Sequence, residues 1–170
     1  MVTDEDLTRL SIRTGRHLLA AKARIVTAES CTAGWIAKLL TDVPGSSEWF
    51  DCGWVTYSNA SKSRDLGVSE DTLTRQGAVS EQAVREMASG ALERSGVDIA
   101  IAVSGIAGPT GATQGKPVGT VWFALAHRRG RAVEFVARVK FFKGDRDTVR
   151  RKSVQFALQL VLGLELPEAA

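Results

Sequence analysis

The sequence predicts an α/β fold: a three-layer α/β/α single domain over residues 1–170, with a mixed, mostly parallel sheet. Helical and strand-like patterns alternate for most of the length. The run Val97–Val103 is almost continuously apolar, which suits a strand covered on both faces. Two consecutive strand patterns, Val118–Ala126 and Ala132–Phe141, can form a hairpin, so at least one sheet edge is expected to be antiparallel.

The first half of the chain alternates helix and strand. Thr3 and Asp6 occupy the two positions of a capping box, and apolar residues then recur at helical spacing. The stretch VPGSS breaks the second helical pattern. In chain order, the predicted elements are a helix from Thr3 to Ala21, a strand at Ala23–Thr27, a helix at Thr32–Leu40, a strand at Asp51–Tyr57 and a short helix from Asn59 to about Leu66.

The second half contains the clearest helix and the longest loop. Val84, Met87 and Ala88 lie at the spacing of one helix face. The stretch 104–119 is rich in glycine and proline and has little to bury, so it is predicted to be a loop. The predicted elements are a helix opening at Ser80, the strand Val97–Val103, the two hairpin strands and a last helix from about Asp145 to Leu162.

Composition narrows the class of protein. The hydrophobic fraction is 44% and the charged fraction 24%, which is typical of a globular domain and argues against disorder. A net charge of +3, with both signs interspersed, favours an anionic ligand more than nucleic acid. The N-terminus lacks a signal-peptide pattern and no apolar run approaches the roughly 20 residues that span a bilayer, so a cytoplasmic protein is expected. Cys31 and Cys52 form no CxxC pair, so no metal site is predicted.

Three loops follow predicted strands: AESCTAG, YSNASK and SGIAGPTG. If these strands are parallel neighbours, the loops converge on one crevice at the carboxyl edge of the sheet. The first loop places Ser30, Cys31 and Thr32 before a helix, whose free N–H groups could hold an anion or an oxyanion. Taken alone, the loop favours a structural role, because serine is among the best N-caps.

The second loop supplies Tyr57 and Lys62. A serine nucleophile needs a base, and the two histidines, His17 and His127, lie far from these loops in sequence. Lysine or tyrosine is left as the proton acceptor, and lysine can serve if its pKa falls from about 10.4 toward 7–8. The competing interpretation of Lys62 is a plain surface lysine.

The third loop is rich in glycine between Gly105 and Gly111, which permits a close backbone approach to a ligand. It matches neither the P-loop nor the dinucleotide fingerprint. Arg146, at the start of the last helix, could grip a phosphate or carboxylate with both arms of its guanidinium, or could simply be an exposed arginine.

Taken together, these segments resemble the family of the C-terminal domain of competence/damage-inducible protein A (CinA), including its stand-alone nicotinamide-nucleotide amidohydrolases. The similar segments, in order from Leu7 to Leu162, are AESCTAGWIAKLLTDVPGSSEWF, VTYSNASK, LGV, GAVSEQAV, VSGIAGPTG, KPVGTVWFA and FKGDRDTVRR. The resemblance implies that nicotinamide mononucleotide and water give nicotinate mononucleotide and ammonia, without a cofactor or metal. The charge distribution and the lack of a long apolar run add the expectation that neither nucleic acid nor a membrane is a partner. The additional N-terminal domain of the full-length competence proteins is expected to be absent.

The resemblance also implies residue roles. Ser30 matches the nucleophile, Lys62 its base partner, and Tyr57 a residue that assists proton transfer or orients the pair. Backbone N–H groups near Cys31 and Thr32 are expected to hold the oxyanion. The residues implied to contact the substrate are Ser47, expected beside the catalytic group, together with Cys31, Thr32, Ser104, Gly105, Gly108 and Arg146.

One residue departs from the family pattern. Ala33 stands where the family commonly has glycine. We expect a helical backbone there, which would make the change harmless, whereas the fit of the ligand would suffer if this position lined the site. Cys31 is a rival nucleophile, although a cysteine enzyme usually needs a histidine partner. Two different functional classes compete with an enzyme: a non-catalytic nucleotide-binding or regulatory module and, on the weakest grounds, a DNA-binding protein. Apolar residues near Trp49, Phe50 and Trp54 suggest a homo-oligomer.

Overall fold

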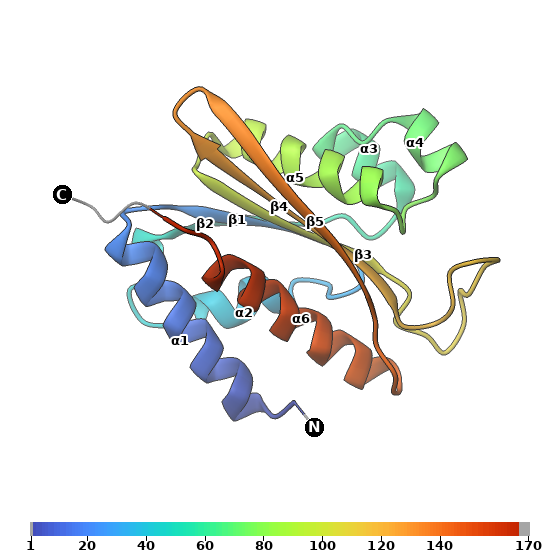
Figure 1. The fold of residues 1–170 in the computed structure, drawn as a ribbon, viewed down its shortest axis with the longest axis horizontal. Coiled ribbons are helices and arrows are strands. Elements are labelled where there is room, and N and C mark those ends of the chain that lie inside the picture. The colour runs from blue at the N-terminus through green and yellow to red at the C-terminus, as the bar shows by residue number, and fades with distance from the viewer. Residues whose placement is uncertain (1, 167–170) are drawn as a thin grey trace.

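The computed structural model of the chain describes residues 2–166, in which five strands form one mixed sheet (Figure 1). In spatial order the strands are β2 (Phe50–Val55), β1 (Ile25–Glu29), β3 (Ile99–Gly105), β4 (Thr120–Arg129) and β5 (Ala132–Phe141). β1 pairs in parallel with both β2 and β3, whereas the β3–β4 and β4–β5 pairs are antiparallel. Within this sheet β4 runs against the other four strands. The mixed sheet and the hairpin at its edge are therefore confirmed.

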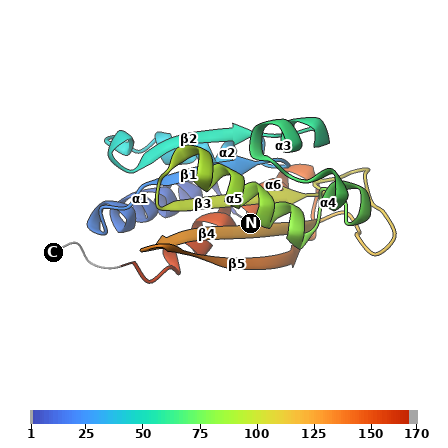
Figure 2. The ribbon, with the colours of Figure 1, turned by 90° about the horizontal axis from the view of Figure 1, so that it is seen from above.

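Helices cover both faces of the sheet, so the three-layer prediction is also confirmed (Figures 1 and 2). One face carries α1 (Asp4–Ala20), α2 (Trp35–Thr41) and α6 (Arg146–Leu162). The other face carries α5 (Glu81–Ser95), with α3 (Asn59–Leu66) and α4 (Glu70–Arg75) beside it. A short 3₁₀ helix, η1 (Ser46–Glu48), connects α2 to β2. None of the helices in residues 2–166 is both long and apolar enough to cross a membrane.

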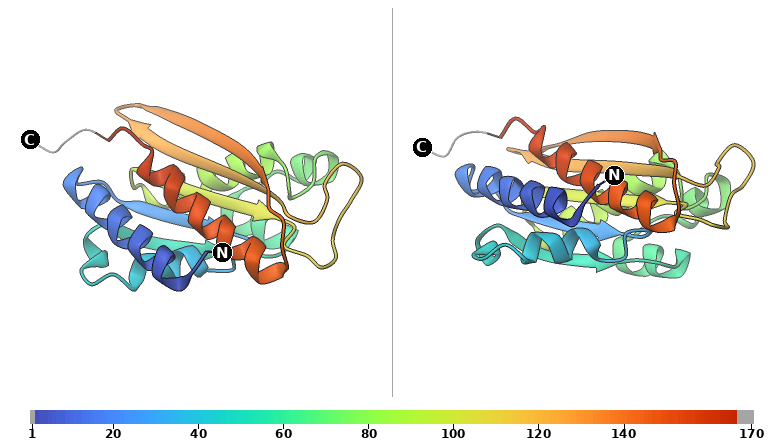
Figure 3. Two further views of the ribbon diagram at one scale, coloured as in Figure 1. Left: turned by 60° about the horizontal axis from the view of Figure 1, so that its bottom comes forward. Right: turned by 90° about the horizontal axis from the view of Figure 1, so that it is seen from below.

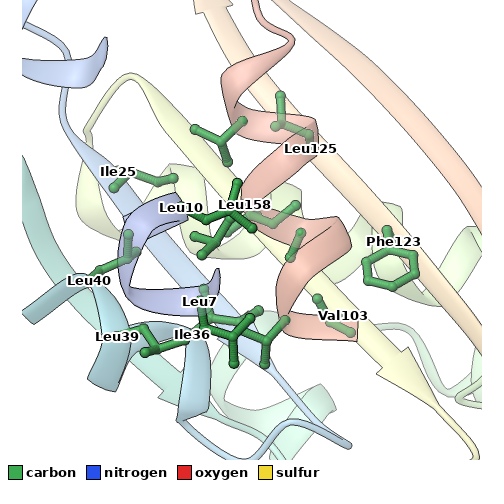
Figure 4. Packing of buried hydrophobic residues seen from close by; sticks show 14 of the residues in the cluster. Leu7, Leu10, Ile25, Ile36, Leu39, Leu40, Val103, Phe123, Leu125 and Leu158 are labelled. Atoms are coloured by element: carbon green, nitrogen blue, oxygen red, sulfur yellow. The ribbon is translucent and has the colours of Figure 1, made fainter. Parts of the chain in front are cut away.

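Each face of the sheet has its own hydrophobic core, because successive strand residues point to opposite sides. Ile25 and Val103 pack under α1, α2 and α6, where Phe123 and Leu158 also lie (Figure 4). α1 and α6 run side by side across this face (Figure 3). On the other face, small residues such as Ala102 pack against α5. The two cores hold the parallel strands rigidly, so the loops at their carboxyl ends start from defined positions.

Several predicted boundaries shift, and one helix was missed. The capping box of Thr3 and Asp6 is present, and α3 and β5 have the predicted bounds. β1 ends at Glu29 rather than at Thr27, because its backbone stays paired with Val55 of β2 and Val103 of β3 up to that residue. α4 has six residues, too few for a hydrophobic period to be visible in the sequence.

The aromatic residues near β2 do not form the exposed surface that the sequence suggested. Trp49 is only 3% exposed, and its ring lies where a Cβ on Gly15 would come within 2.7 Å of it. Phe50 and Trp54 are half-buried against the two cores. The interpretation of Trp49 as a self-association residue is therefore wrong, while the homo-oligomer itself stays a prediction.

Candidate active site

The three loops converge as expected. Because β2, β1 and β3 are parallel neighbours, their carboxyl ends share one edge of the sheet. The loops border a cavity of about 200 Å³ there. It is lined by Ser30, Cys31, Tyr57, Lys62, Ala78, Val79, Ser104, Gly105, Ala107 and Arg146. Most of the residues predicted from the sequence therefore meet in one place.

A serine–lysine pair lies in this cavity. The Nζ atom of Lys62 donates a hydrogen bond to the Oγ atom of Ser30, 3.0 Å away. It also donates to the carbonyl oxygens of Thr56 at 2.6 Å and Tyr57 at 3.4 Å. Lys62 projects from the first turn of α3, which the Ser58 side chain caps by accepting from the N–H of Ser61. The helix therefore fixes the lysine relative to the serine.

The environment of Lys62 favours its neutral form. Lys62 is 1% exposed and, with Leu66, is one of the two buried residues of α3, so the surface-lysine interpretation is wrong. Burial lowers the pKa of Lys62 from 10.5 to about 8, because the charged ammonium loses its hydration. Its acceptors are uncharged oxygens, and no salt bridge in residues 2–166 includes it. A neutral lysine can accept a proton from a serine hydroxyl.

Ser30 does not cap the following helix. The N-cap of α2 is Gly34, which has no side chain. The N–H groups of Ile36 and Ala37 instead donate to the Glu29 carboxylate at 3.1 and 2.9 Å. Glu29 is fully buried, and sequence reasoning missed it because an acidic residue at a strand end does not show what it will pair with. The Ser30 hydroxyl is therefore free for chemistry.

The turn between Ser30 and α2 is left-handed. Ala33 has φ 51° and Gly34 has φ 86°. The expectation of a helical Ala33 is wrong, since α2 begins only at Trp35. A left-handed backbone crowds a Cβ against the following carbonyl and costs a non-glycine residue roughly 1 kcal/mol. The glycine that is usual in the family would avoid this strain at position 33.

The side chains of Cys31 and Thr32 are poor candidates for chemistry. Cys31 is 5% exposed and packs with the apolar core, and burial raises its pKa to about 12. A thiol in that state has almost no reactive thiolate at neutral pH. Thr32 is fully buried, and its hydroxyl has no hydrogen-bond partner within residues 2–166. Only the backbone of these two residues is suited to contact a substrate.

Tyr57 and Arg146 form the rim of the cavity. The Tyr57 hydroxyl accepts a hydrogen bond from Arg146 Nη2 at 3.2 Å, and Arg146 Nη1 donates to the Gly108 carbonyl at 2.8 Å. Tyr57 is 61% exposed, so its ring offers an open flat surface. The arginine thus ties the second and third loops together at the start of α6.

The glycines of the third loop allow close packing. A Cβ on Gly105 would come within 2.7 Å of Val121, and one on Gly108, which has φ 84°, within 2.5 Å of Val118. Ser104 lines the cavity at the end of β3 and is 1% exposed. Ser104 and Gly105 line the cavity, whereas Gly108 does not. At both glycines the packing leaves little room for larger side chains.

Ser47 does not lie in this cavity. It is exposed in η1, which precedes β2 at the amino edge of the sheet, where Phe50 pairs with Ile25. Ser30 follows the other end of β1, about 15 Å away along the strand at roughly 3.3 Å per residue. Within this chain Ser47 is therefore not beside Ser30, because α2 carries the chain back across the sheet before Ser47. A role of Ser47 at the site stays a prediction.

Ala78 and Val79 line the cavity but were not predicted as site residues. They belong to the turn before α5, held near the third loop by a 2.5 Å hydrogen bond from Lys116 Nζ to the Gln76 carbonyl. Their apolar side chains carry no chemical signal, although the segment GAVSEQAV supported the family resemblance. They can provide the apolar wall that an aromatic ring needs.

A larger hollow of about 590 Å³ lies at the opposite edge of the sheet, beside His127 and Asp98. It contains neither a serine nor a buried lysine, so size alone does not select the chemical site. Within residues 2–166, no three His, Cys, Asp or Glu side chains gather where they could hold a metal ion.

Comparison with known proteins agrees with the sequence motifs. The model of the CinA C-terminal domain family matches residues 7–164. Nicotinamide-nucleotide amidohydrolase PncC of Escherichia coli (strain K12) is 53% identical over 158 residues, covering 93% of this chain and 94% of the relative. The protein of the same name from Pseudomonas putida is 48% identical, covering 94% and 98%. The crystal structure of a CinA superfamily protein from Escherichia coli superimposes with a TM-score of 0.87 and 39% identity, covering 95% and 92%.

Proposed function

Because this chain belongs to the CinA C-terminal domain family, we propose that it is a nicotinamide-nucleotide amidohydrolase that uses Ser30 and Lys62 as nucleophile and base. The reaction converts nicotinamide mononucleotide and water into nicotinate mononucleotide and ammonia. The observation that carries the Ser/Lys assignment is the 3.0 Å hydrogen bond between Ser30 and a lysine that is 1% exposed. The similarity to relatives named for this activity supports the substrate.

In the first half of the reaction, the Oγ atom of Ser30 attacks the carboxamide carbon while neutral Lys62 takes the hydroxyl proton. The carboxamide oxygen gains negative charge, which the backbone N–H groups of Cys31 and Thr32 stabilise. Collapse of this intermediate breaks the C–N bond. Protonated Lys62 gives its proton to the departing nitrogen, so ammonia leaves and an acyl-enzyme remains.

In the second half, water attacks the acyl carbon and Lys62 accepts a proton from it. The Ser30 oxygen leaves with that proton, which releases nicotinate mononucleotide and restores the neutral pair. The positive charge of the pyridinium ring makes its carboxamide more electrophilic than an ordinary amide. The same charge opposes protonation of the nearby lysine.

Arg146, Tyr57, Ser104 and the third loop, including Gly105 and Gly108, are placed around the rest of the substrate in this proposal. An arginine fork suits the ribose hydroxyls and the phosphate, and an exposed tyrosine ring can stack on a flat ligand. The rim hydrogen bonds of Arg146 to Tyr57 and Gly108 support this placement. Ala78 and Val79 would then face the pyridinium ring.

Ammonia release from nicotinamide mononucleotide tests the nucleophile and the base. Ser30→Ala and Lys62→Ala should each lower turnover at least about 10³-fold, because each removes half of a unit that acts together. Cys31→Ala is the matched control and should retain turnover, since only its backbone takes part. Full turnover in Ser30→Ala, or loss in Cys31→Ala alone, would transfer the nucleophile to Cys31.

The substrate class is tested in the same assay with nicotinamide riboside, which lacks the phosphate. We expect KM to be higher for the riboside than for the mononucleotide. If Arg146 contacts the phosphate, this difference in KM should be larger in the wild type than in Arg146→Ala. The rival interpretation, a non-catalytic nucleotide-binding module, requires tight mononucleotide binding with no ammonia released.

A further inference from the structure

Arg150 lies outside the cavity and donates hydrogen bonds to the turn that follows Ser30. Its Nε atom donates to the carbonyl oxygen of Cys31 at 3.1 Å, and its Nη2 atom donates to the carbonyl oxygen of Thr32 at 3.0 Å. The guanidinium carbon also lies 5.1 Å from the centre of the Trp35 ring. The two carbonyls belong to consecutive residues, so the planar guanidinium bridges two successive peptide groups.

The Cys31 carbonyl belongs to the same peptide group as the N–H of Thr32. A peptide group is planar and trans, so this N–H points away from the carbonyl and hence away from Arg150. Within residues 2–166 the Thr32 N–H has no hydrogen-bond acceptor, although Ala33 N–H donates to the Ser30 carbonyl and Trp35 N–H to the Thr32 carbonyl. The donor next to the nucleophile is therefore oriented and unoccupied.

A charged donor on a carbonyl also changes the far side of its peptide group. The guanidinium withdraws electron density from the Cys31 carbonyl and makes the attached N–H of Thr32 a stronger donor. An N–H that is both oriented and polarised is what a developing oxyanion needs, because it has no reorganisation to undergo.

The turn also needs to be held in place. Ala33 has φ 51°, a conformation that an alanine rarely adopts without support from its surroundings. Glu29 fixes one side through the N–H groups of α2, and Arg150 fixes the other through the two carbonyls. Glu29 and Arg150 therefore hold the turn after Ser30 from two sides, and neither belongs to the Ser30–Lys62 pair.

We propose that Arg150 is a positioning residue of the reaction, which orients and polarises the Cys31–Thr32 peptide group so that its N–H receives the oxyanion. This inference rests on the proposed function. Arg150 does not touch the substrate, so its removal should slow the chemical step and leave substrate binding nearly unchanged.

Arg151 offers a matched control on the same helix. Its guanidinium carbon lies 5.1 Å from the same Trp35 ring, but its hydrogen bonds go to Asp147 and Asp4 rather than to the turn. Arg151→Met therefore removes an equal charge and the same ring contact. Arg150→Met removes the fork, and Arg150→Lys keeps the charge while a single ammonium cannot span both carbonyls in the same geometry.

The experiment measures kcat, KM and their pH dependence for ammonia release by the full chain. We expect kcat of Arg150→Met to fall at least about tenfold, with KM within about threefold of wild type. The acidic limb of the pH profile, where protonation of Lys62 lowers activity, should not move, since Lys62 keeps its surroundings. Arg150→Lys should lose less, and Arg151→Met should stay within about twofold of wild-type kcat. In Arg150→Ala, added methylguanidinium should restore part of kcat, but it should not raise kcat in Arg151→Ala.

Two outcomes would overturn the inference. If kcat of both Arg150→Met and Arg150→Lys stays within about threefold of wild type, Arg150 has no positioning role, and the proposed function still stands. Equal losses of kcat in the Arg150 and Arg151 variants would mean that both act only through the stability of α6, and not through the Cys31–Thr32 peptide group. A wild-type chain that releases no ammonia would instead overturn the proposed function, and the inference with it.

Discussion

At the scale of single residues, the burial of Lys62 is the feature that supports a catalytic role for its pair with Ser30. The loss of hydration lowers the pKa of Lys62 to about 8, whereas burial raises the pKa of Cys31 to about 12. The same physical cause therefore prepares one group to accept a proton and keeps the other from acting as a thiolate. In the proposed mechanism, Ser30 is therefore the nucleophile and Lys62 the base.

The pH dependence of kcat/KM follows from this assignment. The base must be neutral, and with a pKa of about 8 only about one tenth of Lys62 is neutral at pH 7. We expect kcat/KM to rise about tenfold per pH unit below pH 8 and to level off above it. Steady-state ammonia release between pH 6 and 10 measures this limb.

An ordinary lysine would place the limb near pH 10.5, and a thiolate with the pKa of Cys31 would place it higher still. Either position would contradict the buried-lysine mechanism. Cys31→Ala, assayed over the same range, is the control and should keep the limb in the same place.

At the scale of elements, the sequence predicted the type of most helices and strands but not the turn between β1 and α2. The capping residues of α1, α3 and α5 are visible in the sequence because a cap acts on N–H groups two or three residues away. The cap of α2 is instead a carboxylate from the preceding strand, seven and eight residues away. A local pattern cannot show such a contact, so the helix start was placed three residues early.

The left-handed turn predicts a stabilising substitution. Ala33→Gly should raise the free energy of unfolding by about 0.5–1 kcal/mol, because relief of the strained Cβ exceeds the added entropy of the unfolded chain. Urea denaturation at constant m-value measures the change. Ala60→Gly, in exposed α3, is the control and should lower the stability by about 0.5–1 kcal/mol. A loss of stability in Ala33→Gly would mean that position 33 is not left-handed in solution.

At the scale of the whole molecule, the site depends on how α3 sits on α5. Gly90 of α5 allows this contact, since a Cβ there would lie 1.8 Å from the carbonyl oxygen of Leu66 at the end of α3. α3 carries Lys62, so the distance between the base and Ser30 depends on a glycine that is far from the cavity. In the proposed mechanism, the layer of helices over this face therefore helps to set the catalytic geometry.

Gly90→Ala tests this dependence. We expect it to lower the free energy of unfolding by at least about 2 kcal/mol and to reduce kcat, because α3 must move away from α5 and take Lys62 with it. Thermal unfolding and ammonia release are measured on the same samples. Gly163→Ala is the control, since a Cβ there would stay 3.5 Å from its nearest neighbour, and both readouts should stay near wild type. If Gly90→Ala is less stable but keeps its kcat, the α3–α5 contact does not control the position of Lys62 relative to Ser30.

The sequence by itself determined the α/β class, the order of the elements and the three loops that carry Ser30, Lys62 and Arg146, because periodicity, caps and glycine-rich turns are local properties of the chain. Only the tertiary structure decided which of these residues meet, that Lys62 is buried and that Ser47 lies at the other edge of the sheet. It also decided which contacts Glu29 and Arg150 make. Arg150 contacts two residues that precede it by 119 and 118 positions in the sequence. Such contacts depend on the packing of α6 against the sheet, which no local pattern encodes.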